Sequence, residues 1–113
     1  MTSDRNGKIG EHLAEKFLIS RGYDILERNY RTKFGEIDLI AKYKDCTVFV
    51  EVKLRSNSNY GFPVEYVNKK KQEKIIKTCQ VYLDVEKDFI RFDIISIIKE
   101  GSKYHIEHIK NAF

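Results

Sequence analysis

The chain has 113 residues and a formal net charge of +4 at pH 7, with 42% hydrophobic and 34% charged residues. This length suffices for one domain and is too short for two, so we expect a single domain over residues 1–113. No apolar run approaches the roughly 20 residues that a membrane-spanning helix needs, and residues 1–10 lack the apolar core of a signal peptide. These features argue against a membrane partner and predict a cytoplasmic location.

The first half of the chain has one helical pattern and three strand patterns. Apolar residues recur at helical spacing over 4–21, which predicts an amphipathic helix, and Gly22 follows as a helix-ending residue. A short apolar run predicts a strand over 23–31. Alternating, β-branched runs over 36–43 and 47–54 predict two further strands that form a hairpin.

The second half of the chain has a loop pattern, a helical pattern and two strand patterns. The polar, glycine-containing stretch 55–63 predicts a loop. Apolar residues at helical spacing predict a second helix over 66–85, and two closing strands are expected over 89–99 and 103–109. The order α-β-β-β-α-β-β favours an α/β fold in which helices flank a mixed central β-sheet.

The two hairpin strands carry acidic residues at alternate positions. Side chains two residues apart in a strand share a face of the sheet. Glu36, Asp38 and Ile40 are therefore expected on one face of the first hairpin strand. Ile37 and Leu39 are expected on the opposite face.

A turn at residues 44–45 would set the register of this hairpin. Asp38 then lies opposite Glu51, and Glu36 lies opposite Lys53. Directly opposed residues have Cβ atoms about 5 Å apart, where like charges destabilise a sheet unless a proton or a cation neutralises them. Carboxylate oxygens favour Mg²⁺ or Mn²⁺. Lys53, on the same face, would stand beside such an ion, where it could orient a water molecule or stabilise charge on a phosphate.

The same charged residues also fit a purely structural interpretation. Antiparallel sheets often expose a charged face to water, and acidic and basic side chains on it pair across strands. Ile40 and Phe49 are expected on the same face, which argues against simple solvation. The strand pattern alone leaves both interpretations open.

An ordered set of motifs resembles a known family. The run Gly35-Glu36-Ile37-Asp38-Leu39-Ile40-Ala41, followed by Glu51-Val52-Lys53, resembles the split Asp…Glu-x-Lys motif of the restriction-endonuclease-like superfamily. A wider set resembles the uncharacterised YraN-like proteins within it and spans nearly the whole chain. Its further pieces are Gly10-Glu11, Asn29-Tyr30-Arg31, Arg55, Gly61, Lys71-Gln72, Arg91-Phe92-Asp93 and Asn111-Ala112-Phe113.

This resemblance, which extends to archaeal Holliday-junction resolvases, implies a restriction-endonuclease-like fold with a metal-dependent phosphodiesterase centre. It implies that Glu11, Asp38 and Glu51, with the carbonyl of Val52, hold Mg²⁺ or Mn²⁺, and that Lys53 positions the attacking water. The implied substrate is nucleic acid, in particular branched or flapped DNA, and the implied assembly is a homodimer. The alternative is a non-catalytic nucleic-acid-binding protein with a vestigial nuclease site, against which the intact Asp-Glu-x-Lys set argues.

The first helix offers an independent check on Glu11. Glu11 lies at the edge of the apolar stripe, from where its side chain can reach over the sheet toward the hairpin. A solvent-facing glutamate fits the same position. Gly10 lies within the stripe, where it either permits close packing of helix on sheet or simply destabilises the helix by about 1 kcal/mol relative to Ala.

Basic and aromatic residues after the hairpin are candidate nucleic-acid contacts. An arginine here could bind a phosphate or form a salt bridge, and an aromatic residue could stack on a base or pack under the second helix. The lysines of the second helix could attract DNA at long range or form an ordinary solvated face. The resemblance implies that a Gln or Lys on this helix supports the site. The candidates are Arg55, Tyr60, Lys70, Lys71, Gln72 and Lys74.

The remaining ionisable and sulfur-containing residues predict no second reactive site. Neither of the two cysteines has CxxC spacing, so we expect reduced thiols. His105 and His108 are three residues apart in a predicted strand, so they face opposite sides and are expected to be structural or exposed. Asp93 lies among apolar residues and is expected to form a salt bridge with Arg91 or Arg31.

Overall fold

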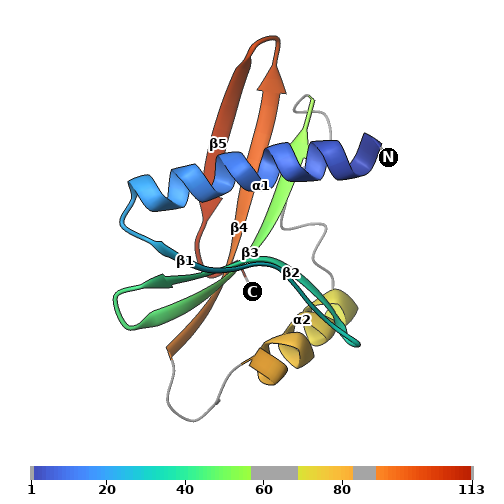
Figure 1. Cartoon of the computed structure of the whole chain (residues 1–113), viewed down its shortest axis with the longest axis vertical. Helices are drawn as coiled ribbons and strands as arrows, with labels where there is room; N and C mark the ends of the chain where they lie inside the picture. Colours follow the sequence, from blue (N-terminus) through green and yellow to red (C-terminus); the bar gives the residue numbers. More distant parts are fainter. Residues whose placement is uncertain (1, 57–68, 83–88, 113) are drawn as a thin grey trace.

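The computed structural model of the chain describes residues 2–56, 69–82 and 89–112. These ranges contain the predicted order of helices and strands, with bounds close to the expected ones (Figure 1). Parts of the predicted loop and of both ends of the second helix lie outside the described residues. The elements are α1 (Thr2–Ser20), β1 (Asp24–Thr32), β2 (Gly35–Tyr43), β3 (Cys46–Arg55), α2 (Lys69–Tyr82), β4 (Phe89–Glu100) and β5 (Lys103–Ile109).

The strands form one sheet in the order β1-β2-β3-β4-β5. Neighbouring strands are antiparallel except for β3 and β4, which pair in parallel. A parallel pair needs a crossover connection, and α2 lies in the segment that makes it. The prediction of a mixed α/β sheet with flanking helices is therefore confirmed, and the arrangement is consistent with the restriction-endonuclease-like class.

The two helices cover opposite faces of the sheet, and each face has its own apolar core. Ala14 of α1 is buried in the first core together with Val50 of β3. Ile75 of α2 is buried in the second core together with Phe49 of β3. Burying one such aliphatic or aromatic side chain contributes roughly 1.5–3 kcal/mol. Because β3 is packed on both faces, the side chains along it have fixed positions.

Gly10 brings α1 close to the sheet. A Cβ atom at Gly10 would lie 3.2 Å from Cβ of Leu54 and 3.4 Å from Cγ1 of Val52. The structure therefore favours the close-packing interpretation of this glycine. The adjacent Glu11 is held beside the sheet as a result.

A buried polar network joins the carboxyl-terminal strands to Tyr23, the residue before β1. Asp93 is 1% exposed and accepts hydrogen bonds from Arg91 Nε and Nη2, each at 2.8 Å. His108 Nε2 lies 2.6 Å from Asp93 Oδ2, and Asn111 N donates to Oδ1 at 3.1 Å. Arg91 also donates to the Tyr23 hydroxyl at 2.6 Å. Of the two predicted arginine partners, Arg91 is the one that binds Asp93, and His108 is structural.

The remaining sequence predictions concern membrane-spanning helices, the two cysteines and His105. Neither described helix is long and apolar enough to cross a membrane. Cys46 and Cys79 are both free thiols, and burial raises the pKa of Cys79 to about 12. His105 is exposed, and its Nε2 lies 3.6 Å from Glu100 Oε2. Neither cysteine is placed for thiolate chemistry, because burial also raises the pKa of Cys46.

Candidate active site

The candidate site lies where the pairing of β2 with β3 ends. The observed register, with Tyr43 opposite Cys46, is the one that the predicted turn requires, and it continues as far as Leu39 opposite Val50. Asp38 precedes Leu39 on β2, and its side chain replaces the next backbone contact: Asp38 Oδ2 accepts a hydrogen bond from Val52 N at 2.8 Å. The carboxylate thus binds to a backbone group of β3 at the point where regular pairing stops.

The predicted alternation of side chains along β2 is wrong at this point. Ile37 and Ile40 lie in the same core, on the face covered by α2. Leu39 lies in the other core, on the face covered by α1. Residues three apart cannot share a face of a regular strand, so β2 is distorted between them, at Asp38.

The neighbouring strand is distorted at the same level. In the β1–β2 register, Leu39 and Ile37 have partners on β1, but the intervening pair of Asn29 with Asp38 is missing. Asn29 has φ +51°, in the left-handed region that Asn tolerates better than most residues with a side chain. This departure from extended geometry lies at the same level as the displaced side-chain alternation on β2.

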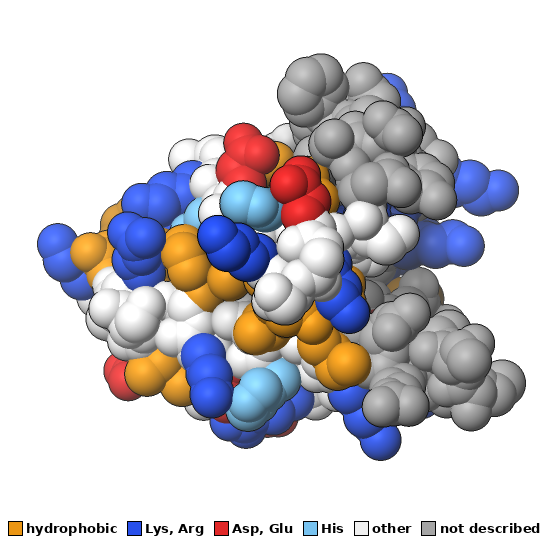
Figure 2. Space-filling view, turned by 90° about the horizontal axis from the view of Figure 1, so that it is seen from above, with side chains coloured by type: hydrophobic (Ala, Val, Ile, Leu, Met, Phe, Trp, Pro, Cys, Tyr) orange, Lys and Arg blue, Asp and Glu red, His pale blue; other side chains and the backbone are white. Residues whose placement is uncertain are grey.

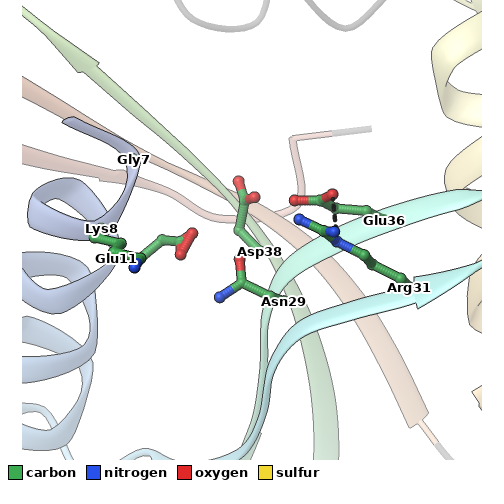
Figure 3. A pocket seen from close by; sticks show the side chains of 7 residues that line it. All are labelled: Gly7, Lys8, Glu11, Asn29, Arg31, Glu36 and Asp38. Carbon is green, nitrogen blue, oxygen red and sulfur yellow. Dashed lines mark ion pairs between the residues drawn. The ribbon is translucent and has the colours of Figure 1, made fainter. Parts of the chain in front are cut away.

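A hollow of about 420 Å³ opens beside Asp38, between α1 and the β1–β2 hairpin. Figure 3 shows the Glu11 carboxylate pointing toward Asp38 from α1, and the Glu36 carboxylate on the other side of Asp38. Arg31 Nε forms an ion pair with Glu36 at 3.0 Å. Of the two positions considered for Glu11, the structure shows the one directed toward the hairpin. The lining residues are Gly7, Lys8, Glu11, Asn29, Arg31, Glu36 and Asp38.

Burial and neighbouring carboxylates disfavour the ionised form of Asp38. Burial raises the pKa of Asp38 to about 7, and the charge of Glu51 adds to the rise. The hydrogen bond from Val52 opposes these effects without cancelling them, and the charges of Glu11 and Glu36 add further repulsion. Burial also raises the pKa of Glu11, against a hydrogen bond with Asn29. A cation placed here would relieve this repulsion.

Glu51 has two lysine partners. Lys71 Nζ of α2 lies 2.9 Å from Glu51 Oε1, and Lys53 Nζ lies 3.4 Å from the same oxygen. The Glu51 side chain is 13% exposed. Lys53 therefore lies beside Glu51, the acidic residue of the Glu-x-Lys motif. The second cation, Lys71, comes from α2, and the strand pattern alone does not predict it.

The residues present fit a divalent cation with two carboxylate ligands. Asp38 and Glu51 interact strongly enough to affect the pKa of Asp38, and their oxygens are the donor type that Mg²⁺ and Mn²⁺ prefer. Mg²⁺ is commonly bound by one or two carboxylates and completes its coordination with water. Within the described ranges, no three His, Cys, Asp or Glu side chains form a group that could hold a metal ion. Glu11 therefore faces the hollow without completing such a group.

Four of the predicted nucleic-acid contacts, among them Lys71, lie on α2. Arg55 is half-buried at the end of β3, Gln72 is half-buried on α2, and Lys70 and Lys74 are exposed on α2. Tyr60 lies outside the described residues. Lys and Arg side chains on the face seen in Figure 2 form several separate groups rather than one patch. The face seen in Figure 2 therefore shows no single basic patch among its described residues.

Sequence reasoning missed several residues that line the hollow. Lys8, Asn29 and Arg31 were not among the predicted site residues, although all three line the hollow around Asp38. The signal that could have identified two of them is the motif Asn29-Tyr30-Arg31. An asparagine inside a predicted strand is unusual and often marks an irregular backbone position.

Comparison with known proteins finds a matching family. Residues 10–97 match the sequence profile of a family described as "Uncharacterised protein family UPF0102". A UPF0102 protein of Persephonella marina is 49% identical over 110 residues, covering 95% of this chain and 91% of the relative. One from Dictyoglomus turgidum is 45% identical over 118 residues and covers both chains fully, at 100%. One from Clostridium botulinum is 48% identical over 113 residues, covering 95% of this chain and 92% of the relative.

Proposed function

The chain belongs to the uncharacterised protein family UPF0102, and on that premise we propose that it is a metal-dependent nuclease that hydrolyses phosphodiester bonds of DNA. The observation that carries the proposal is the half-buried Asp38 carboxylate, whose pKa the charge of Glu51 helps to raise, with Lys53 Nζ at 3.4 Å from Glu51 Oε1. Two repelling acids and an adjacent lysine at the end of a β-ladder form the kind of centre that phosphoryl transfer needs. A cytoplasmic location and a homodimer belong to the same proposal.

Each residue has a defined role in this proposal. Asp38 and Glu51, with the carbonyl of Val52, would hold Mg²⁺ or Mn²⁺, and Glu11 would complete the acidic wall from α1. A bound divalent ion would lower the pKa of a water molecule and neutralise charge on the phosphate. Lys53 would hold the attacking water in line with the phosphorus and stabilise the additional negative charge of the transition state.

The substrate is inferred from the openness of the site. The hollow beside Asp38 is lined by Lys8 and Arg31 as well as by carboxylates, so a phosphodiester backbone would meet cations at its rim. Arg55 and the exposed lysines of α2 would contact more distant phosphates. We include branched and flapped DNA in the proposed substrate class, because an exposed strand end or junction can enter such an open site.

One observation favours a second candidate, a DNA-binding protein without turnover. Lys71 and Lys53 already neutralise Glu51, so the site can be read as a stable ion-pair cluster that needs no metal. A vestigial site of this kind would bind DNA through the same basic residues without cutting it.

A cleavage assay with matched variants separates the two candidates. Labelled linear, flapped and four-way DNA is incubated with Mg²⁺, with Mn²⁺ or with chelator. The nuclease proposal expects metal-dependent products that Asp38→Asn abolishes and Asp45→Asn, in the hairpin turn, leaves unchanged. Retarded bands without products, equal in the wild type and in Asp38→Asn, would establish the binding protein instead.

A further inference from the structure

The second cation at Glu51 comes from a different layer of the fold. Lys71 lies on α2, and its Nζ donates a hydrogen bond to Glu51 Oε1 at 2.9 Å. Its side chain is 35% exposed, and the Glu51 side chain is 13% exposed. Burial alone would lower the pKa of Lys71, but the hydrogen bond and charge of Glu51 raise it, and the charge of Asp38 adds to the rise. The ammonium group therefore interacts with both carboxylates of the proposed metal site.

The ammonium group of Lys71 and a divalent cation would compete for the same oxygen, Glu51 Oε1. Glu51 Oε1 already has Lys71 at 2.9 Å and Lys53 at 3.4 Å. A metal ligated by this oxygen would bring two positive charges toward Lys71, so the shorter ion pair has to open. Lys53 is anchored on the same strand as Glu51, whereas Lys71 belongs to a helix and can swing away without disturbing β3.

We propose that Lys71 closes the metal-free site by occupying Glu51, and that it transfers to a substrate phosphate when a divalent ion enters. This inference rests on the proposed function, because it concerns the order in which ion and DNA occupy that site. The phosphodiester backbone of DNA offers the released ammonium group an anionic partner. Metal and DNA then bind cooperatively, because each favours the position of Lys71 that the other requires.

The chain offers a matched control for this lysine. Lys70 is exposed, precedes Lys71 on the same helix, and carries the same charge. Lys70→Gln and Lys71→Gln therefore change the net charge equally but differ in whether they remove the partner of Glu51. A third variant, Lys71→Arg, keeps the charge at the position.

The test is a Mn²⁺ titration monitored by electron paramagnetic resonance, in which free Mn²⁺ is counted directly. Without DNA, Lys71→Gln should bind Mn²⁺ about tenfold more tightly than the wild type, because no partly buried ion pair has to be broken. Lys70→Gln should remain within about twofold of the wild type, since exposed charges are screened. Lys71→Arg should bind no more tightly than the wild type.

A second titration measures the coupling to DNA. It is run in a Lys53→Gln background, so that the proposed catalysis does not consume the DNA. DNA should tighten Mn²⁺ binding when Lys71 is present and should lose that effect when Lys71→Gln is added. Equal coupling with and without Lys71 would overturn the transfer of the lysine to phosphate.

The outcomes distinguish this inference from the proposed function. If Asp38→Asn abolishes Mn²⁺ binding while Lys71→Gln and Lys70→Gln behave alike, the metal site stands and the role of Lys71 is wrong. If Asp38→Asn binds Mn²⁺ as the wild type does, the ion is not at this site. Both the proposed function and the role of Lys71 then fail.

Discussion

The environments of two aspartates, the buried Asp93 and the half-buried Asp38, shift their pKa values in opposite directions. Asp93 is fixed in its ionised form: hydrogen bonds from His108 and Arg91 outweigh the effect of burial and lower its pKa. Loss of solvation and then the charges of neighbouring carboxylates raise the pKa of Asp38 to about 7, against the hydrogen bond from Val52 N. Environment, not residue type, therefore assigns one aspartate to the structure and the other to the candidate site.

Asp38→Asn should stabilise the metal-free protein at pH 8. An aspartate whose pKa is raised on folding makes the folded state lose stability as pH rises from about 4 to about 7. Asparagine carries no charge and avoids this loss. The free energy of unfolding of the variant should therefore exceed that of the wild type by up to about 4 kcal/mol at pH 8, and by little at pH 4. Urea unfolding with chelator at both pH values measures the difference, and parallel pH profiles of the two proteins would contradict the account.

Asp93→Asn should have the opposite effect. The substitution leaves the Arg91 guanidinium without its buried counter-charge, which typically destabilises a protein by about 3–5 kcal/mol. Because the pKa of Asp93 is lowered, the wild-type advantage should be present at neutral pH and decline as pH falls through the folded pKa. The same urea measurements report this loss, and a loss below about 1 kcal/mol at pH 7 would show that the network contributes little.

At the scale of elements, the irregular position in β1 shapes the site on β2. Asn29 adopts φ +51° opposite Asp38 and also forms a hydrogen bond with Glu11. Asn29→Gly and Asn29→Ala both remove that hydrogen bond, but only glycine tolerates the backbone conformation freely. We expect Asn29→Ala to be less stable than Asn29→Gly by about 1 kcal/mol in urea unfolding. Equal stabilities would mean that the backbone at this position is unstrained.

Most of the elements and the hairpin register follow from local patterns in the sequence. The turn at residues 44–45 and the β-branched runs on either side fix which residues of β2 and β3 face each other, as observed up to Leu39 and Val50. The distortion at Asp38 could not be predicted in this way, because it depends on a left-handed residue in a neighbouring strand. The Lys71–Glu51 ion pair likewise depends on how α2 packs, which no local pattern contains.

At the scale of the whole molecule, side chains from both helices lie near the end of the β2–β3 ladder. Glu11 reaches the Asp38 hollow from α1, and Lys71 reaches Glu51 from α2 on the opposite face. The parallel pairing of β3 with β4 places β3 at the centre of the sheet, where both helices can contact it. The candidate site is thus a property of the assembled fold.

The distribution of charge predicts a local effect on DNA binding. If the exposed lysines of α2 contact phosphates, Lys70→Gln combined with Lys74→Gln should reduce the salt dependence of DNA affinity, by up to about 2 in the slope of log K against log salt. Lys99→Gln combined with Lys103→Gln, in the β4–β5 hairpin, removes the same charge as a control. Fluorescence anisotropy at several salt concentrations gives the slopes, and equal changes in the two pairs would exclude α2 as the contact surface.

The central claim is that a divalent ion belongs between Asp38 and Glu51. Crystals of the protein soaked in Mn²⁺ and measured near the manganese absorption edge locate the ion directly. We predict an anomalous peak about 2.1 Å from one oxygen of each carboxylate, with Lys71 Nζ displaced from Glu51. A manganese peak elsewhere on the chain, with the Lys71–Glu51 ion pair intact, would contradict the claim.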